Sequence, residues 1–205
     1  MELYYAPGAC SLAPHIVARE LGLPVQLKRV DLAARKTEDG ADFLAINPKG
    51  YVPALSLGTG DVLTEVATLL QYLVDQAPQA NLAPAQGSMA RYRFIEWLTF
   101  ISSEIHKGFG PLWSPATPDA TRAATVERLG TRFAHLDRHL ATRPFLMGDG
   151  YTAADAYLFT VLSWASYLKV DLSPYPNLTN YLQRVAARPA VQDALRAEGL
   201  LKEAA

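Results

Sequence analysis

The sequence predicts two domains of different class, an α/β domain followed by an all-helical domain. In the first 80 residues, short segments typical of strands alternate with amphipathic segments. From residue 89 onward, apolar residues recur at the three- and four-residue spacing of helices. Between them, residues 77–88 are rich in Pro, Ala, Gln and Asn and show no periodicity. We therefore expect an α/β domain at 1–79, a linker at 80–87 and a helical domain at 88–205.

The expected order of elements in the first domain is β-α-β, a loop, and then β-β-α. The segment "ELYYA" is short and aromatic, as strands are, and the helical pattern that starts at Ser11 stops at "LGLP". "VQLKRVDL" alternates apolar and polar residues, which predicts a half-exposed strand. A polar loop with a short helix at 42–46 then leads to a hairpin at 53–65, which turns at "GTGD". An amphipathic helix at 64–76 completes the domain.

The second domain is expected to consist of helices only. Its most apolar segment, 153–168, is preceded by "GYTAAD", in which Thr152 and Asp155 have the spacing of a capping box. We interpret this pair as structural, because a capping carboxylate already has a complete set of partners. The other expected helices cover 89–109, 119–142, 178–187 and 191–197.

Composition and charge exclude several classes of function. The net charge is -1 with a pI near 6.4, which gives no electrostatic case for a nucleic-acid or membrane partner. The N-terminus lacks the pattern of a secretory signal, and segment 153–168 is too short to span a bilayer. The chain has one cysteine, which excludes an intrachain disulfide and fits a reducing compartment. We expect a cytoplasmic protein, and no residue spacing predicts a metal site.

Cys10 lies where a strand and a Pro-Gly turn lead into a helix. Backbone N–H groups at a helix N-terminus favour a thiolate, which would make Cys10 a reactive cysteine. Free cysteine is also among the most buried residue types, so a role as a small apolar core residue stays open. The sequence "CSLA" has no second cysteine, so any redox cycle would need a thiol from outside the chain.

Three further positions are candidates whose structural alternatives also stay open. A cis Val52–Pro53 bond would present the backbone of Val52 to an extended ligand, whereas a trans bond would only begin a strand. Glu65 would either complement a helix dipole or bind an ammonium group. His106 belongs to a polar row that would either face solvent or, across a cleft, pair with the thiolate of Cys10 or polarise a substrate.

The segments "YYAPGACSLAPHI", "NPKGYVPAL", "LTEVATLLQYL", "IEWLTFISSEIHKGF" and "TAADAYLFTVL", in this order, resemble the bacterial beta-class glutathione transferases. The resemblance covers nearly the whole chain, and the combination of Cys10, His106 and Lys107 is its specific part. It implies the cytosolic glutathione transferase fold, with a thioredoxin-like first domain and an all-α second domain. It also implies a homodimer and glutathione as co-substrate.

The resemblance also implies roles for individual residues. Cys10 would face the glutathione sulfur, where it would either donate a hydrogen bond to the thiolate or form a mixed disulfide, and His106 would lie near it. Val52, before a cis Pro53, would pair with the cysteinyl part of glutathione, and Ser103 and Glu104 would reach the site of the other subunit. Further glutathione-binding residues are Arg35, Tyr51, Glu65, Val66, Thr99 and Lys107. The electrophile pocket would be lined by Phe109, Trp113, Trp164 and Tyr167.

The chain departs from the family pattern at three of these positions. Val66 stands where many relatives carry Ser, Arg35 where Lys is common, and Thr99 where some have a longer amide. The hydroxyl contact to the γ-glutamyl carboxylate is therefore missing.

The leading hypothesis is a glutathione transferase that activates the glutathione thiolate for attack on apolar electrophiles. The alternatives are a glutathione-dependent thiol-disulfide reductase or peroxidase, a reductive dehalogenase that uses Cys10, and a non-catalytic binder of apolar ligands.

Overall fold

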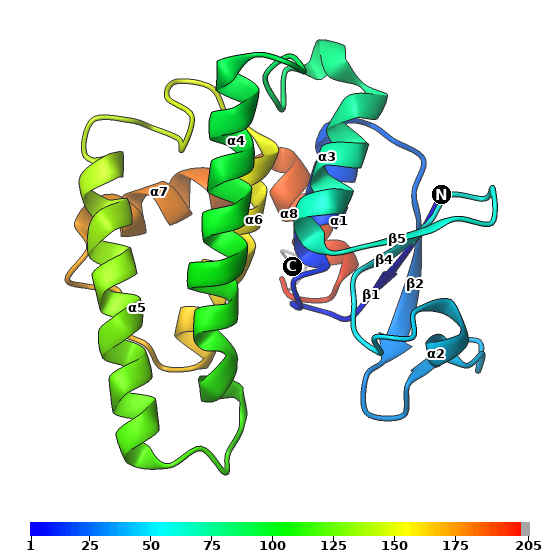
Figure 1. Cartoon of the computed structure of the whole chain (residues 1–205), viewed down its shortest axis with the longest axis horizontal. Coiled ribbons are helices and arrows are strands. Elements are labelled where there is room, and N and C mark those ends of the chain that lie inside the picture. The colour runs from blue at the N-terminus through cyan, green and yellow to red at the C-terminus, as the bar shows by residue number, and fades with distance from the viewer. Residues whose placement is uncertain (202–205) are drawn as a thin grey trace. The chain divides into compact units, whose positions relative to one another are not determined.

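A computed structural model describes residues 1–201, and within it the chain divides into two compact units. Of the described residues, unit 1 consists of Met1–Asn81 together with residues 187–201, and unit 2 is Leu82–Ala186. The first boundary falls inside the expected linker. The chain after Ala186 was expected in the helical domain but packs with unit 1, because its helix lies against the first helix of that unit (Figure 1).

Unit 1 is built on a five-stranded mixed sheet with the strand order β3-β2-β1-β4-β5. The central strand β1 pairs in parallel with β2 and antiparallel with β4. The expected loop at residues 33–53 also contains a short strand, β3, which pairs antiparallel with the end of β2. The strands are β1 (Glu2–Tyr5), β2 (Gln26–Asp31), β3 (Lys36–Thr37), β4 (Ala54–Ser56) and β5 (Val62–Thr64).

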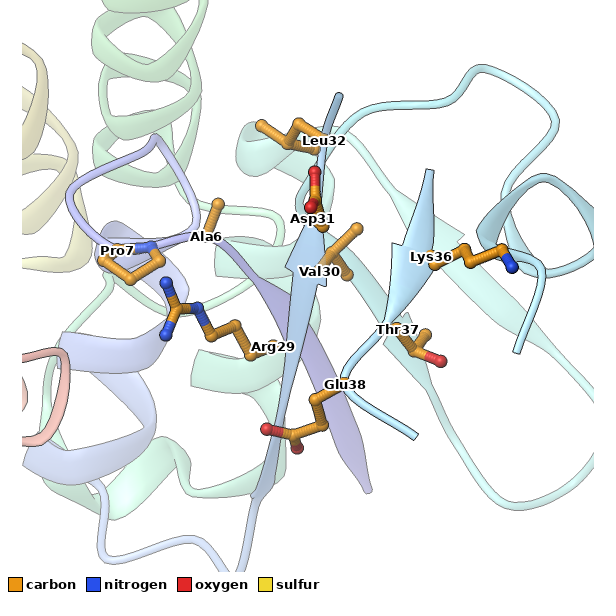
Figure 2. A pocket seen from close by; sticks show the side chains of 9 residues that line it. All are labelled: Ala6, Pro7, Arg29, Val30, Asp31, Leu32, Lys36, Thr37 and Glu38. Carbon is orange, nitrogen blue, oxygen red and sulfur yellow. The ribbon is translucent and has the colours of Figure 1, made fainter. Parts of the chain in front are cut away.

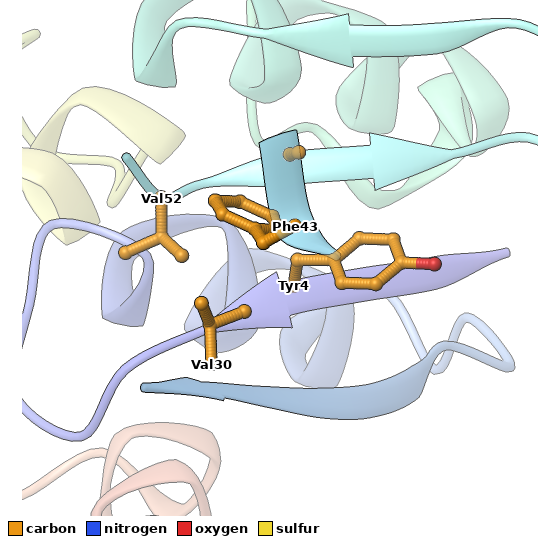
Figure 3. Packing of buried hydrophobic residues seen from close by; sticks show 5 residues of the cluster. Tyr4, Val30, Phe43 and Val52 are labelled. Atoms are coloured by element: carbon orange, nitrogen blue, oxygen red, sulfur yellow. The ribbon is translucent and has the colours of Figure 1, made fainter. Parts of the chain in front are cut away.

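Both faces of β1 are covered. Successive side chains of a strand point to opposite faces, and the neighbouring residues Leu3 and Tyr4 are both buried. Tyr4 packs with Val30, Phe43, Val52 and Ala54 in one buried cluster, with the rings of Tyr4 and Phe43 5.8 Å apart (Figure 3). The neighbouring side chain, Leu3, is buried on the opposite face. The helices of unit 1 are α1 (Leu12–Glu20), α2 (Phe43–Ile46), α3 (Val66–Gln76), the 3-10 turn η1 (Pro78–Ala80) and α8 (Pro189–Ala197).

Unit 2 is entirely helical, as expected. Its central helix α6 is buried over nearly its whole length, which agrees with its apolar sequence. The single helix expected at 89–109 is three segments instead, because α4 gives way to a π-helical segment and then to a 3-10 segment. The segments are α4 (Met89–Phe100), η2 (Ile101–His106), η3 (Lys107–Trp113), α5 (Asp119–Leu140), α6 (Ala153–Tyr167) and α7 (Pro176–Ala186).

The capping box at the start of α6 is confirmed. The carboxylate of Asp155 accepts hydrogen bonds from the backbone N–H of Thr152 (2.8 Å) and that of Leu146 (2.9 Å). The hydroxyl groups of Thr152 and Tyr181 donate to the same carboxylate. Burial raises the pKa of Asp155 to about 6, and these donors oppose the rise. Among residues 1–201, no helix combines the length and the apolar character that crossing a membrane would require.

Candidate active site

Cys10 lies in the loop between β1 and α1, and the residue as a whole is partly buried. Its thiol donates a hydrogen bond to the backbone carbonyl of Val52, with 3.3 Å between the Sγ and O atoms. The thiol is thereby joined to the loop that precedes β4. The loop of Cys10 turns at Gly8, whose φ of 71° is one that glycine adopts without strain.

The thiol of Cys10 is less acidic than its position near a helix N-terminus would predict. Burial raises the pKa of Cys10 to about 12, and the negative charge of Glu65 adds to the rise. Backbone N–H groups lower the pKa by less than burial raises it. The backbone thus acts in the direction expected at a helix N-terminus, but burial outweighs it in the free protein. In its protonated form Cys10 donates a hydrogen bond, as it does to Val52.

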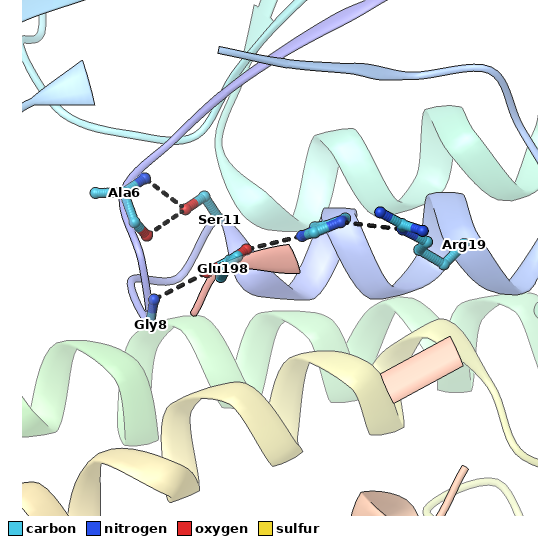
Figure 4. Close-up of polar contacts among 6 residues, drawn as sticks. Ala6, Gly8, Ser11, Arg19 and Glu198 are labelled. Atoms are coloured by element: carbon cyan, nitrogen blue, oxygen red, sulfur yellow. Dashed lines mark hydrogen bonds and ion pairs between the residues drawn. The ribbon is translucent and has the colours of Figure 1, made fainter. Parts of the chain in front are cut away.

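The loop that carries Cys10 is anchored by a buried polar chain from the end of α8 (Figure 4). The carboxylate of Glu198 accepts a hydrogen bond from the Gly8 N–H (2.9 Å) and lies 2.8 Å from Nδ1 of His15. Arg19 donates to the other ring nitrogen of His15. Sequence analysis missed this anchor, because 183 residues separate Glu198 from His15 and no local pattern links them.

A second loop, residues 47–53, presents the backbone of Val52. The Val52–Pro53 peptide bond is cis, as the resemblance implied, and the side chain of Val52 is buried in the core of unit 1. Asn47 holds the loop, because its side chain donates to the Tyr51 carbonyl (2.7 Å) and accepts from the Lys49 N–H (3.2 Å). The side chain of Tyr51 is exposed. Asn47, which sequence analysis did not single out, is a positioning residue for this loop.

Arg35 and Glu65, two of the expected glutathione-binding residues, border the same loop. The guanidinium group of Arg35 lies so close to Gly50 that a Cβ there would be 3.3 Å from its Nη1 atom. Glu65 is the N-cap of α3 and has a φ of 72°, which non-glycine residues rarely adopt. Val66, the first residue of α3, has a buried side chain.

Lys49 forms an ion pair with the carboxylate of Glu65. Its Nζ atom lies 2.5 Å from Oε1 of Glu65 and 2.9 Å from Oγ1 of Thr64. The hydrogen bond to Glu65 is the largest of the effects that raise the pKa of Lys49. Both side chains of the ion pair are about half exposed. Lys49 lies within the motif "NPKGYVPAL", but nothing in its spacing indicates a pairing with Glu65.

In unit 2, His106 is held by aromatic side chains of α6. Its Nδ1 atom lies 2.7 Å from the hydroxyl oxygen of Tyr157. The ring of Trp164 meets the imidazole edge-on, with 5.0 Å between centroids. These contacts fix the orientation of the ring. His106 ends the π-helical segment η2, and such segments are frequent at functional sites.

The other expected polar residues of unit 2 lie on α4, η2 and η3. The hydroxyl of Thr99 donates to the Ile95 carbonyl, and that of Ser103 donates to the Thr99 carbonyl. Glu104 accepts two hydrogen bonds from the guanidinium group of Arg132 in α5, at 2.9 and 2.7 Å. The side chain of Lys107 is exposed.

The aromatic residues expected to line an electrophile pocket differ in exposure. Tyr167 and Trp113 stack at 5.7 Å, and 78% of Tyr167 and 45% of Trp113 are exposed. Trp164 meets Trp113 edge-on at 5.4 Å and is mostly buried. Phe109 is fully buried and packs on Phe133 and Trp164, so in this structure it is a core residue that supports the other rings.

A pocket of about 590 Å³ opens in unit 1 beside the loop that leads to Cys10. The side chain of Arg29 extends toward Pro7, and the lining includes both acidic and basic residues (Figure 2). None of the expected site residues lines this pocket, which sequence analysis did not predict. The lining residues are Ala6, Pro7, Arg29, Val30, Asp31, Leu32, Lys36, Thr37 and Glu38. The described residues hold no cluster of three or more His, Cys, Asp or Glu that could bind a metal ion.

The expected site residues thus form two groups, each within its own unit. In unit 1, Cys10 contacts the Val52 backbone, and Arg35 and Glu65 border the loop that carries Val52. In unit 2, His106 and the aromatic rings are joined through Trp164.

Comparison with known proteins identifies the family. Residues 8–76 match the model of the glutathione S-transferase N-terminal domain, and residues 100–189 match that of the C-terminal domain. The chain is 46% identical to glutathione S-transferase GstA of Escherichia coli O157:H7, over 98% of this chain and 100% of that protein.

Two solved structures are similarly close. A beta-class glutathione S-transferase from Sphingomonas chungbukensis shares 46% identity with a TM-score of 0.95. A sphingomonad glutathione S-transferase complexed with glutathione shares 49% identity with a TM-score of 0.94. In each case the match covers 98% of this chain and 100% of the other. These matches confirm the resemblance seen in the sequence: the chain belongs to the glutathione S-transferase family.

Proposed function

We propose that this enzyme transfers glutathione to apolar electrophiles and that Cys10 acts as a hydrogen-bond donor to the glutathione sulfur. The observation that carries the proposal is the hydrogen bond that the Cys10 thiol donates to the Val52 carbonyl, in the loop that is proposed to bind glutathione. Burial also raises the pKa of this thiol, which favours its protonated form. An ordinary thiol ionises near pH 8.5, so the glutathione sulfur loses its proton before Cys10 does. Of the two sulfurs, glutathione then carries the charge and Cys10 keeps the proton.

The reaction that follows is a nucleophilic substitution or addition. The thiolate of glutathione attacks the electrophilic carbon, the new C–S bond forms, and a leaving group departs with the electron pair of its bond. A donated hydrogen bond stabilises the thiolate and raises its fraction at neutral pH. His106, oriented by Tyr157, is proposed as a second group near this sulfur. Family membership favours transfer over the reductase, dehalogenase and binder alternatives.

Each remaining residue is proposed to bind the part of glutathione that its chemistry fits. Val52 would pair through its backbone with the cysteinyl part, next to Tyr51 and Pro53, and Glu65 with Val66 would bind the γ-glutamyl end. Arg35 and Lys107 would lie near the glycyl carboxylate, with Thr99 nearby. The electrophile would lie on the stacked rings of Trp113 and Tyr167, backed by Trp164.

The proposal includes a homodimer in the cytoplasm, in which Ser103 and Glu104 reach the site of the other subunit. Arg132 holds the Glu104 carboxylate within unit 2, so Glu104 would act there as one part of an ion pair.

Replacement of Cys10 tests this assignment. In Cys10→Ala the donor is lost, and a hydrogen bond to a charged group contributes about 1.5–3 kcal/mol. We therefore expect the thiolate fraction of bound glutathione at pH 7, and with it the conjugation rate, to fall roughly 10- to 100-fold. Cys10→Ser keeps a donor and is expected to lie between Cys10→Ala and the wild type. The measurements are the conjugation rate and the pH titration of the bound thiol by ultraviolet absorbance.

Disulfide reduction is assayed in parallel on the same variants. Full conjugation by Cys10→Ala, combined with loss of reduction, would contradict the donor role and support a redox enzyme. Failure of the folded wild-type protein to bind immobilised glutathione would refute the transferase function as a whole.

A further inference from the structure

Lys49 and Glu65 form a pair of opposite charges at the edge of the proposed glutathione site. The ammonium group of Lys49 contacts both Glu65 and the Thr64 hydroxyl. The backbone of Lys49 is held by Asn47, whose side chain accepts its N–H and whose carbonyl accepts the N–H of Gly50. Because the backbone is fixed while the side chain is about 43% exposed, the ammonium group can move without rearrangement of the loop.

This pair matches the charges of a free α-amino acid head group. The γ-glutamyl end of glutathione carries an ammonium and a carboxylate on the same carbon. An ammonium that binds the same Oε1 atom of Glu65 competes with Lys49 for it and displaces the lysine when it takes over this contact. The released ammonium of Lys49 then lies within reach of the ligand carboxylate, which is only one carbon away from the ligand ammonium. The exchange leaves all four charges paired.

The residue at position 66 supplies no side-chain donor for the ligand carboxylate. Val66 has no hydroxyl group, and its side chain is buried, so it can offer the ligand carboxylate only its backbone N–H. A lysine supplies three donors and a full positive charge from a flexible stem.

We infer that Lys49 determines specificity for the γ-glutamyl head group by exchanging its partner, from Glu65 in the free enzyme to the α-carboxylate of bound glutathione. This inference rests on the proposed function. It predicts that Lys49 favours ligands that carry the carboxylate and acts against ligands that carry the ammonium alone, because only the former offer Lys49 a new partner.

The test is a calorimetric titration of the whole protein with two ligands, glutathione and its analogue without the γ-glutamyl α-carboxylate (4-aminobutyryl-Cys-Gly). In Lys49→Met, which keeps the length of the side chain but not its charge, we expect about fivefold weaker binding of glutathione. This is the fold-change for a half-exposed ion pair of about 1 kcal/mol. The analogue should bind the variant as well as, or more tightly than, the wild type.

The controls separate charge from structure. Lys49→Arg retains the charge and should bind glutathione within about twofold of the wild type. Lys28→Met removes a lysine of the same unit that pairs with Asp39 at 3.5 Å, and it should change neither affinity.

Three results would be decisive against the inference or its basis. Unchanged or tighter binding of glutathione by Lys49→Met would overturn the inference, because Lys49 would then only compete for Glu65. Equal losses for both ligands would also overturn it, because they would indicate a general structural effect. A wild-type protein that binds neither ligand would instead refute the proposed function.

Discussion

At the scale of single residues, Cys10 and Asp155 show how burial controls ionisation. Both are acids whose charged form is disfavoured by the loss of water, and both have raised pKa values. Asp155 receives four hydrogen bonds that oppose the rise, and its pKa reaches only about 6. For Cys10 the opposing backbone contribution is smaller than the effect of burial, so its pKa reaches about 12. Burial therefore raises the pKa of both residues, and the number of hydrogen bonds to the charged form decides by how much.

The raised pKa of Cys10 predicts slow alkylation in the free protein. The thiolate is the reactive form, and a thiol with a pKa near 12 has far less of it at pH 8 than an ordinary cysteine. We expect iodoacetamide to modify the folded protein at least about a hundredfold more slowly than the same chain in denaturant. Because the chain has one cysteine, intact mass spectrometry reports this site alone. Equal rates in the two states would show that Cys10 is an activated thiolate after all.

At the scale of elements, the start of α6 depends on a carboxylate that lies among apolar residues. The carboxylate of Asp155 joins the first turn of α6 to the backbone of Leu146, and the hydroxyl of Tyr181 in α7 adds a contact from a third segment. A local capping motif thus becomes the meeting point of three segments. Its ionisation should therefore influence the stability of unit 2.

The pH dependence of stability tests the environment of Asp155. The folded-state pKa of about 6 lies above the unfolded value of about 3.9, so the folded state binds more protons between these values. The stability contributed by the protonated group is fully present below pH 4 and is lost as the pH rises through 6. The loss amounts to roughly 3 kcal/mol for a shift of about two units.

Asp155→Asn removes this titration and retains one acceptor oxygen. The difference in unfolding free energy between wild type and variant should therefore change between pH 4 and 6 and be flat above pH 7, as measured by urea denaturation. A difference that is constant from pH 3 to 8 would mean that the pKa of Asp155 is unshifted.

At the scale of the whole molecule, the last helix, α8, belongs to the same unit as the first strand. Helix α8 packs on α1, and Arg188 makes two hydrogen bonds to the carboxylate of Glu20, at 2.6 and 3.0 Å. Glu198 then holds both Gly8 and His15. The loop of Cys10 is thus stabilised by residues from the far end of the sequence.

Removal of the chain after Ala186 should loosen unit 1 selectively. We expect faster amide hydrogen exchange in α1 and in the loop of Cys10, and nearly unchanged exchange in α5 and α6, because α8 packs on α1 and Glu198 holds the Gly8 loop. Hydrogen-exchange mass spectrometry on the full chain and the truncated chain measures both regions together. The milder variant Glu198→Gln should affect the Gly8 loop alone, and uniform exchange changes across both units would contradict this division.

Much of the fold follows from local patterns in the sequence. Period-two and helical spacings predict most of the strands and helices, and the spacing of Thr152 and Asp155 predicts the capping box, because these features depend on neighbouring residues. Strand β3 was missed because two residues are too few to show a period. The break in the helix after Phe100 was missed because the spacing of apolar residues continues through it.

The sequence by itself determined most of the order of elements, the family, and the residue types of the candidate site. Only the tertiary structure decided the protonation of Cys10, the pairing of Lys49 with Glu65, and the anchoring of the Gly8 loop by Glu198. Ionisation depends on how much water surrounds a group and on charges brought near it by folding. Pairings between distant segments likewise exist only once the chain has folded, so local spacing carries no signal for them.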